Sequence, residues 1–190
     1  MLLHNNRYIV SSYVETAPPL DQFDIVHNTE KIDIHDAYMA RIMKIDRSDG
    51  HSFTVALLDQ ICSGNTACAI LEKGYLTLIL FQAILRIDLD TGSILQYVRC
   101  KNLGGLFEIH RIHGGYLIWG EGDIFRYDDS LNQIWHFTGR DILVSPHTNK
   151  NFWIKDHQIH CCDFSGWQYI LDFDGNVLQD FHAFPTADTL

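Results

Sequence analysis

Hydrophobic and polar residues alternate in short runs along most of this chain, and polar turns that contain glycine separate the runs. At Ile87–Leu95, for example, an alternating segment leads into Asp-Thr-Gly-Ser, and a second apolar run follows. This pattern is typical of a β-hairpin. No segment shows a helical period of 3.6 residues over twelve or more positions, and the one place left open for a short helix is about residues 29–40. The pattern therefore predicts an all-β protein.

The hairpin pattern occurs four times at a nearly constant interval. The four copies are Ile45–Phe53, Ile87–Leu95, Tyr127–Trp135 and Leu171–Leu178. The turn residues that we expect to take a positive φ are Gly50, Gly92, Asn132 and Gly175. Periods of about 40 to 45 residues are typical of propeller blades or of another β array.

Each repeat therefore predicts a four-stranded antiparallel unit, and we expect one β-repeat domain over residues 1–190. The four units are expected at about residues 15–58, 59–100, 101–139 and 140–182. In the second unit the strands are expected at 67–72, 75–81, 83–89 and 93–99. In the third unit they are expected at 106–112, 115–119, 123–128 and 133–138. In the fourth copy, Asp163–Gly166 and Asp172–Gly175 both fit the hairpin turn, so its register stays open.

The run Ile-Asp-Leu-Asp-Thr-Gly-Ser-Ile-Leu, with Trp135 at the last position of another copy, resembles the outer hairpin of quinoprotein-type and WD-type β-propeller repeats. The resemblance extends over about residues 38–180. It implies a small, about four-bladed, or incomplete β-propeller-like architecture, with a barrel or a curved open sheet as alternatives. A strand near Val177–Phe181 is a candidate to close the array against residues 7–14. The Trp-Asp dipeptide and the tryptophan-docking signature of quinoprotein enzymes are absent, so we expect no quinone and no other cofactor.

Charge and cysteine content restrict the partners and the compartment. The net charge is −10, from 14 basic and 24 acidic residues, which argues against nucleic acid and anionic membranes and favours a basic protein partner. The five cysteines form no CxxC pair, and the first residues lack a basic region followed by an apolar core. We therefore expect no signal peptide and a reducing, cytoplasmic location. No apolar run approaches the roughly 20 residues that cross a bilayer.

Three motifs suggest catalysis or metal binding. Asp90–Ser93 reads Asp-Thr-Gly-Ser, as in aspartic proteases, but it occupies a hairpin-turn position where a turn alone explains these residues. The residues His157, His160, Cys161 and Asp163 are weak candidates for a metal site, because strand alternation separates His157 and Cys161 from His160. The calcium-loop-like pairs at Asp88 and Asp172 lack the bidentate glutamate of an EF-hand. We expect no catalytic residue and no metal.

Aromatic residues are concentrated in the second half of the chain, and most are expected in the core. A tentative binding surface is formed by Trp119, Glu121, Asp123, Trp153 and Trp167. The hypothesis is a non-enzymatic protein-binding module. A narrower version is an acidic immunity or antitoxin-type protein that neutralises a basic toxin such as a nuclease. The alternatives are a small metal-binding or ligand-binding β protein or enzyme that uses the His157/His160/Asp163 region, and a structural oligomer that pairs through an open sheet edge.

Overall fold

The computed structural model describes residues 1–35, 37–60, 66–101 and 104–183. Strands dominate these residues, and the only helices within them are two single 3-10 turns, η1 (Leu20–Gln22) and η2 (Thr66–Cys68). The chain divides into two compact units. Unit 1 comprises Met1–Cys100 and Leu106–Ile109, and unit 2 comprises Lys101–Gly105 and His110–Leu190. Each unit is described by itself, and the single domain expected over residues 1–190 stays a prediction.

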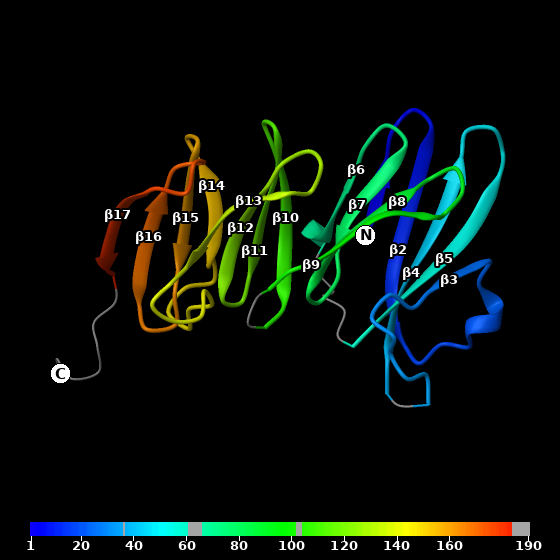
Figure 1. The fold of residues 1–190 in the computed structure, drawn as a ribbon, viewed down its shortest axis with the longest axis horizontal. Coiled ribbons are helices and arrows are strands. Elements are labelled where there is room, and N and C mark those ends of the chain that lie inside the picture. Colours follow the sequence, from blue (N-terminus) through cyan, green and yellow to red (C-terminus); the bar gives the residue numbers. More distant parts are fainter. Residues whose placement is uncertain (36, 61–65, 102–103, 184–190) are drawn as a thin grey trace. The chain divides into compact units, whose positions relative to one another are not determined.

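Unit 1 contains the first and second sheets (Figure 1). The first sheet has the order β1-β2-β4-β5-β3, and its strands in chain order are β1 (Leu2–His4), β2 (Tyr8–Thr16), β3 (Ile25–His27), β4 (Met39–Arg47) and β5 (Ser52–Asp59). The second sheet is an antiparallel meander of β6 (Ala69–Leu71), β7 (Tyr75–Ile79), β8 (Ala83–Asp88) and β9 (Ile94–Arg99).

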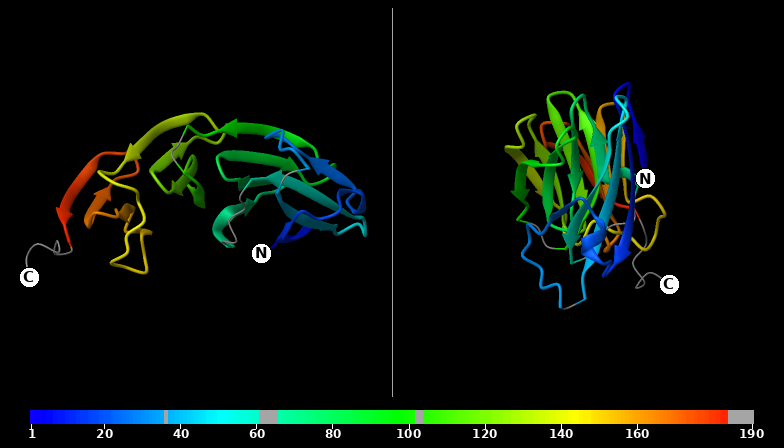
Figure 2. Two further views of the ribbon diagram at one scale, coloured as in Figure 1. Left: turned by 90° about the horizontal axis from the view of Figure 1, so that it is seen from below. Right: turned by 90° about the vertical axis from the view of Figure 1, so that its right-hand side faces the viewer.

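The third and fourth sheets each have four strands in chain order. The third sheet consists of β10 (Leu106–Ile112), β11 (Gly115–Gly120), β12 (Asp123–Tyr127) and β13 (Gln133–Thr138). The fourth sheet consists of β14 (Phe152–Lys155), β15 (Gln158–Cys162), β16 (Trp167–Leu171) and β17 (Val177–His182). Figure 2 shows the same strands from two further directions.

These sheets confirm the all-β repeat architecture that the sequence predicts. The expected strands of the second and third units agree with the structure to within two residues at each end. In the first unit, the sheet also contains β1 and most of β2, which precede the expected start at residue 15. These strands belong to the sheet because β2 pairs with β4 along its whole length, from Tyr8 opposite Arg47 to Thr16 opposite Met39.

The four repeated turns lie at equivalent places, between the third and fourth strands of the antiparallel array in each sheet. Gly50, Gly92 and Gly175 have φ values of 90°, 71° and 86°. In the third copy the prediction of Asn132 is wrong, because the residue with positive φ is Leu131, at 57°. Asn132 instead donates its side-chain amide to Asp128 Oδ2 at 2.9 Å. Asn176 makes the same 2.9 Å bond to Asp172 in the fourth copy.

The open register of the fourth copy is resolved by strand pairing. Asp172–Gly175 joins β16 to β17, as the repeat requires, whereas Asp163–Gly166 joins β15 to β16. Carboxylates organise both turns, because Asp172 Oδ1 accepts from the backbone N–H of Asn176 at 2.8 Å and Asp163 Oδ1 accepts from that of Trp167 at 2.8 Å. The two turns therefore look alike in sequence because the same Asx geometry is used at both.

The segment from residue 17 to 38 contains no helix over residues 29–35, where the sequence left one open. It supplies β3, which pairs in parallel with β5 at the edge of the first sheet. His27 Nε2 lies 2.8 Å from the carbonyl oxygen of Gly92, and the Glu30 carboxylate binds Arg99 at 2.7 Å. The segment thus connects the first sheet to the outer hairpin of the second, and these tertiary contacts fix its position.

Each unit is a pair of sheets packed face to face. In unit 1 the core contains side chains of both sheets, including Val10, Ile45, Leu78 and Leu85, each at most 1% exposed. In unit 2 the indole of Trp119 stacks on Phe152 of the next sheet, with ring centroids 5.6 Å apart. The sequence predicted that a strand at Val177–Phe181 would pair with residues 7–14, and this prediction is wrong. Instead, β2 pairs with β4 on one edge and with β1 on the other over Ile9–Ser11.

Candidate functional site: the loop-end pocket of unit 2

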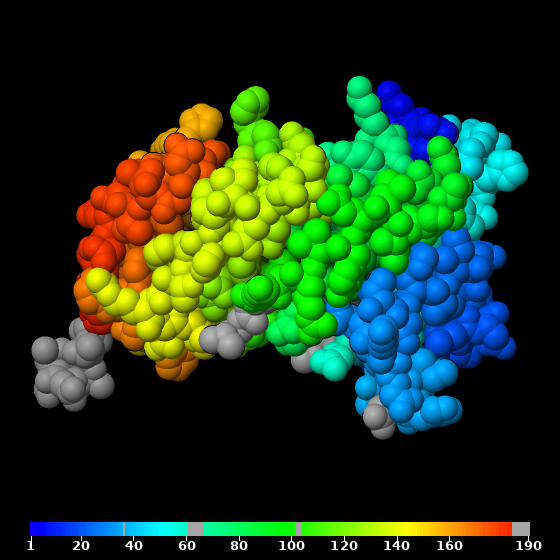
Figure 3. All heavy atoms as spheres, in the orientation of Figure 1, coloured from blue at the N-terminus to red at the C-terminus, as the bar shows by residue number. Residues whose placement is uncertain are grey.

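A concavity in unit 2 lies where β13 ends and the chain leaves for β14. We call it the loop-end pocket, and its lining residues are Lys101, Gly122, Asp123, Thr138, Gly139, Arg140, Asp141 and Ile142. Its volume is about 660 Å³, within the range of roughly 300 to 1,000 Å³ that binding pockets occupy. Residues 139–151, which link the two sheets, appear in yellow on the surface in Figure 3.

Hydrogen bonds hold the chain that forms the pocket. The backbone N–H of Leu143 donates to the carbonyl of Glu121 at 2.5 Å, and Trp119 Nε1 donates to the carbonyl of Leu143 at 3.2 Å. The N–H of Phe164 donates to the carbonyl of Ile142 at 2.8 Å. These bonds attach the linker to both sheets of unit 2, so the pocket is formed before any ligand arrives.

Arg140 forms one wall, and its charge is balanced within the protein. Its guanidinium lies 3.4 Å from the ring centroid of Trp167 and donates to Asp180 at 2.6 Å. Its backbone N–H donates to the phenol oxygen of Tyr169 at 3.0 Å. Burial raises the pKa of Tyr169, and the hydrogen bond that this phenol donates to Asp163 raises it further. Tyr169 therefore stays a neutral donor, and Arg140 is fixed by packing rather than free for a ligand.

The remaining charged groups of the pocket are two carboxylates and one ammonium group. Asp141 is exposed, and its Oδ1 accepts only from the neighbouring N–H of Ile142 at 2.8 Å among the bonds that the structure shows. Asp123 is 7% exposed, and Thr138 Oγ1 donates to it at 2.6 Å. Because Arg140 is paired with Asp180, the accessible groups are Asp141 and the ammonium of Lys101 on the rim. A cationic group of a ligand could therefore pair with the exposed carboxylate of Asp141.

The structure places the five tentative binding residues in three different settings. Asp123 lines the pocket, and Glu121 lies next to it in the β11–β12 turn. Trp167 packs under Arg140. Trp119 is only 9% exposed and belongs to the core. Trp153 lies on the other face of the fourth sheet, stacked on His160 with centroids 5.0 Å apart.

Sequence analysis missed Thr138–Ile142, which supply most of the lining. The available signal was local: a Thr-Gly-Arg-Asp run that begins at the last residue of a strand and leads into the long connection to β14. Loops of this kind carry binding residues more often than strands do. Gly139 also reflects close packing, since a Cβ there would lie 2.8 Å from Leu143 Cδ2.

The weak metal candidates do not converge. His157 packs edge-on against Phe173, His160 stacks on Trp153, and Cys161 is fully buried. Asp163 accepts hydrogen bonds from Ser165, Trp167 and Tyr169 and so has a structural role. Within the described residues, no group of three His, Cys, Asp or Glu side chains is arranged to hold a metal ion.

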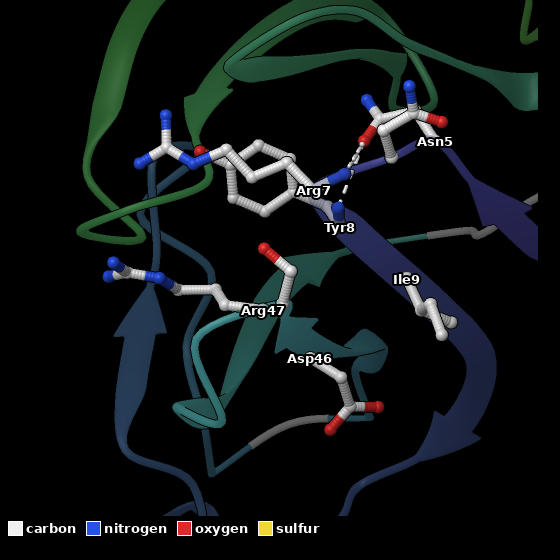
Figure 4. A pocket seen from close by; sticks show the side chains of 8 residues that line it. Asn5, Arg7, Tyr8, Ile9, Asp46 and Arg47 are labelled. Atoms are coloured by element: carbon white, nitrogen blue, oxygen red, sulfur yellow. Dashed lines mark hydrogen bonds between the residues drawn. The ribbon is translucent and has the colours of Figure 1, made fainter.

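A second pocket, in unit 1, is lined by Arg7 and Arg47 (Figure 4). Asp90 of the Asp-Thr-Gly-Ser turn accepts from Arg7 and Tyr8, at 2.8 and 2.9 Å, and lies 3.5 Å from Arg47 Nε. The pocket measures about 150 Å³, which is below the usual size for a ligand site. The interpretation of this tetrapeptide as a structural turn is therefore supported, because Asp90 belongs to an ion-pair network that joins the two sheets of unit 1.

No protein-family model matches the chain, and no curated protein matches it significantly. Solved structures do match. The computationally designed Ika8 protein aligns over 96% of this chain and 61% of its own, with a TM-score of 0.51 and 9% identity. Chaetomium thermophilum Raptor aligns over 78% of this chain and 15% of its own, with a TM-score of 0.51 and 14% identity. The Neurospora crassa Pan2 WD40 domain aligns over 95% and 58%, with a TM-score of 0.48 and 9% identity.

This chain therefore spans less than two thirds of each of these structures. At such identities the likeness concerns the fold alone. The described residues form four sheets, none of them closed, and these sheets give the chain a β-propeller-like repeat architecture. No helix within the described residues has the length and apolar character needed to cross a membrane.

Proposed function

We propose that this chain is a non-enzymatic binding module whose loop-end pocket receives a basic segment of a partner protein. The observation that carries the proposal is the preformed pocket of about 660 Å³ with the exposed carboxylate of Asp141 on its wall. A rigid scaffold that presents loops is suited to binding, since little entropy is lost when a preformed site is occupied.

Overall charge supports a basic partner. A net charge of −10 attracts cationic segments over distances of about a Debye length and accelerates their encounter with the protein. The narrower proposal, an immunity-type protein that neutralises a basic toxin in the cytoplasm, rests on size, acidity and free thiols alone. Three of the cysteines, Cys68, Cys161 and Cys162, are buried free thiols, which suits a reducing compartment.

The test is a selection of random displayed peptides on the immobilised chain. We expect the selected peptides to be rich in Lys and Arg, and their affinity to fall as salt is raised. Asp141→Lys should weaken them by about tenfold or more, because it replaces the accessible carboxylate by a like charge. Asp49→Lys, in a turn of unit 1, is the matched charge control and should have a smaller effect. Peptides without basic residues, or equal effects of the two variants, would contradict the proposal.

A further inference from the structure

Unit 2 contains a further pocket, at the opposite ends of β12 and β13 from the loop-end pocket. Its walls come from the β10–β11 turn, from Arg126 and Trp135 on these two strands, and from Phe173 and Asp174 in the β16–β17 turn. We call it the turn-end pocket. Its volume is about 430 Å³, which is within the usual range for a binding site. It shares no lining residue with the loop-end pocket.

The β16–β17 turn packs on the third sheet as the β8–β9 turn packs on the first. A Cβ atom at Gly175 would lie 2.7 Å from Trp135 Cδ2, and a Cβ atom at Gly92 would lie 2.8 Å from Phe53 Cε2. Trp135 and Phe53 hold the same place in the hairpin repeat, at the last position of their copies. The contact between the two sheets of unit 1 therefore shows which groups can occupy the space of the turn-end pocket.

Unit 1 surrounds its turn carboxylate with donors, whereas unit 2 does not. Asp90 and Asp174 are equivalent, because the backbone N–H of each donates to Oδ1 of the aspartate two residues earlier, at 2.9 and 3.0 Å. Asp90 accepts from Arg7 at 2.8 Å and from the phenol of Tyr8 at 2.9 Å, and Arg47 Nε lies 3.5 Å away. Within the described residues, the Asp174 side chain accepts no hydrogen bond and forms no ion pair.

The third sheet lacks the donors that the first sheet supplies. Arg47 and Asp128 are equivalent, because the carbonyl of each accepts the turn hydrogen bond from the N–H three residues later, at 3.0 and 3.1 Å. Tyr8 lies opposite Arg47, and strand pairing places Gly115 opposite Asp128. The residues before them, an arginine and a glycine, correspond as well. Two glycines and an aspartate thus occupy the positions of the three groups that contact Asp90, which leaves the turn-end pocket open.

Arg126 lines the pocket, but its guanidinium is bound to the backbone of its own sheet. It donates to the carbonyl oxygens of His113 and Gly114, at 2.9 and 3.1 Å, and to those of Tyr116 and Tyr127. The residue is 8% exposed and forms no ion pair within the part of the chain that the structure describes. These bonds fix the guanidinium, so it does not neutralise a carboxylate across the pocket by direct contact.

The charges around the two turns differ by one. In unit 1, two arginines meet two aspartates in one connected set of ion pairs. In unit 2, burial lowers the pKa of Arg126, whereas the negative charges of Asp129, Asp128 and Asp174 raise it. Asp129 is itself paired with Arg111 at 2.5 Å, so two carboxylates remain for one guanidinium. A single added cation would restore the balance that unit 1 has.

We infer that the turn-end pocket binds the arginine side chain of a partner polypeptide, with Asp174 as its ion-pair partner and the rings of Trp135 and Phe173 beside it. The Arg7 guanidinium, which contacts the equivalent carboxylate in unit 1, also lies 5.1 Å from the Tyr8 ring centroid. A planar guanidinium can pair with a carboxylate and stack on an aromatic ring at the same time. Trp135 and Phe173 are half-buried and line the pocket. This site is separate from the loop-end pocket and does not rest on the proposed function.

The experiment is an NMR titration of the isotope-labelled full chain with N-acetyl-L-arginine amide. The four tryptophan indole N–H signals report the binding, and Trp135→Phe identifies the signal of the pocket. We expect this signal to move with a dissociation constant in the millimolar range, because one ion pair and one ring contact hold a small probe. N-acetyl-L-citrulline amide, which has nearly the same shape without the charge, should bind at least about fivefold more weakly.

A pair of matched variants locates the site. Asp174→Asn should weaken the arginine probe by about fivefold or more, because it removes the carboxylate charge and keeps the size of the side chain. Asp49→Asn makes the same change in the equivalent turn of the first sheet and should leave the affinity unchanged. Both aspartates are exposed, so neither variant removes core packing.

Three results would overturn the inference. The first is equal binding of the arginine and citrulline probes, and the second is a Trp135 signal that does not move at high millimolar concentration. The third is an affinity for the arginine probe that Asp174→Asn leaves unchanged. If Asp141→Lys abolished that binding, the arginine would lie in the loop-end pocket and the proposed function would stand. Loss of binding in Asp174→Asn alone would support the turn-end site even if the loop-end pocket selected no basic peptide.

Discussion

The first and fourth sheets share a repeat pattern, yet their outward faces are opposite in character. The first sheet places the Lys44–Asp46 ion pair at positions where the fourth sheet's inward face has Tyr169 and Leu171. It also receives Phe23 as a cover. The fourth sheet carries Trp153, Ile170 and Phe181, together with Lys155, on the face turned away from the third sheet. The comparison shows that equivalent strand positions of one repeat can carry an exposed ion pair in one sheet and buried core residues in another.

The largest expected effect separates the two faces of one strand. Phe152→Ala should lower the free energy of unfolding by about 3 to 5 kcal/mol, because it removes a buried ring that stacks on Trp119. Trp153→Ala, one residue later, removes a half-exposed ring and should cost the monomer roughly 1 kcal/mol. Chemical denaturation at low protein concentration measures both. If the two variants lost the same free energy of unfolding, the Trp153 ring would be as well covered in the monomer as the Phe152 ring.

The second effect compares the equivalent turns of the two sheets. A Cβ at Gly175 would lie 2.7 Å from Trp135 Cδ2, whereas a Cβ at Gly50 would meet nothing within 4 Å. Gly50→Ala should therefore cost about 1 kcal/mol, from positive φ alone. Gly175→Ala should cost roughly 1 to 3 kcal/mol more, because the Trp135 indole, which donates to the Phe173 carbonyl, would have to move. Thermal or urea unfolding of the pair gives the difference, and similar losses would show that Trp135 yields freely.

A third change makes the outer face of the first sheet apolar. Lys44→Leu with Asp46→Val should alter the free energy of unfolding by no more than about 0.5 kcal/mol, since the ion pair is exposed. It should nevertheless create an exposed apolar face, and the variant should self-associate more strongly than the wild type. Light scattering measures this. A double variant that behaves as the wild type would show that Phe23 and its segment, rather than the ion pair, protect the first sheet.

The smallest effect concerns His160. Its pKa is lowered in the folded protein, so the unfolded chain binds the proton more tightly. Stability linked to this group is present above the unfolded pKa of about 6.5 and is lost as the pH falls from there toward the folded pKa. His160→Gln should therefore lose less stability than the wild type between neutral and mildly acidic pH. If the free energies of unfolding of the two proteins changed in parallel with pH, the pH dependence would belong to a group other than His160.

Strand hairpins were predictable from the sequence because their signals are local. Alternation sets the strands, and Asp with Gly or Asn sets the turns, so the second and third sheets were located to within two residues at each end. The exception, Leu131, takes a positive φ of 57° because the Asp128 side chain fixes the turn one residue earlier than the glycine pattern suggests. The candidate site was predicted only in part: Asp123 lines the pocket, and Thr138–Ile142 were missed.

By itself, the sequence determined that this protein is a β-repeat with four hairpins and an acidic surface, because periodicity, turn chemistry and charge are properties of neighbouring residues. Tertiary structure decided which face of each strand is covered. Phe152 and Trp153 look equivalent in the sequence, and only the approach of the third sheet buries one of them. It also decided that residues 25–27 pair in parallel with β5, and that a linker rather than a tryptophan cluster forms the pocket. Packing between distant segments carries no local signature, so these features emerge only when the sheets meet.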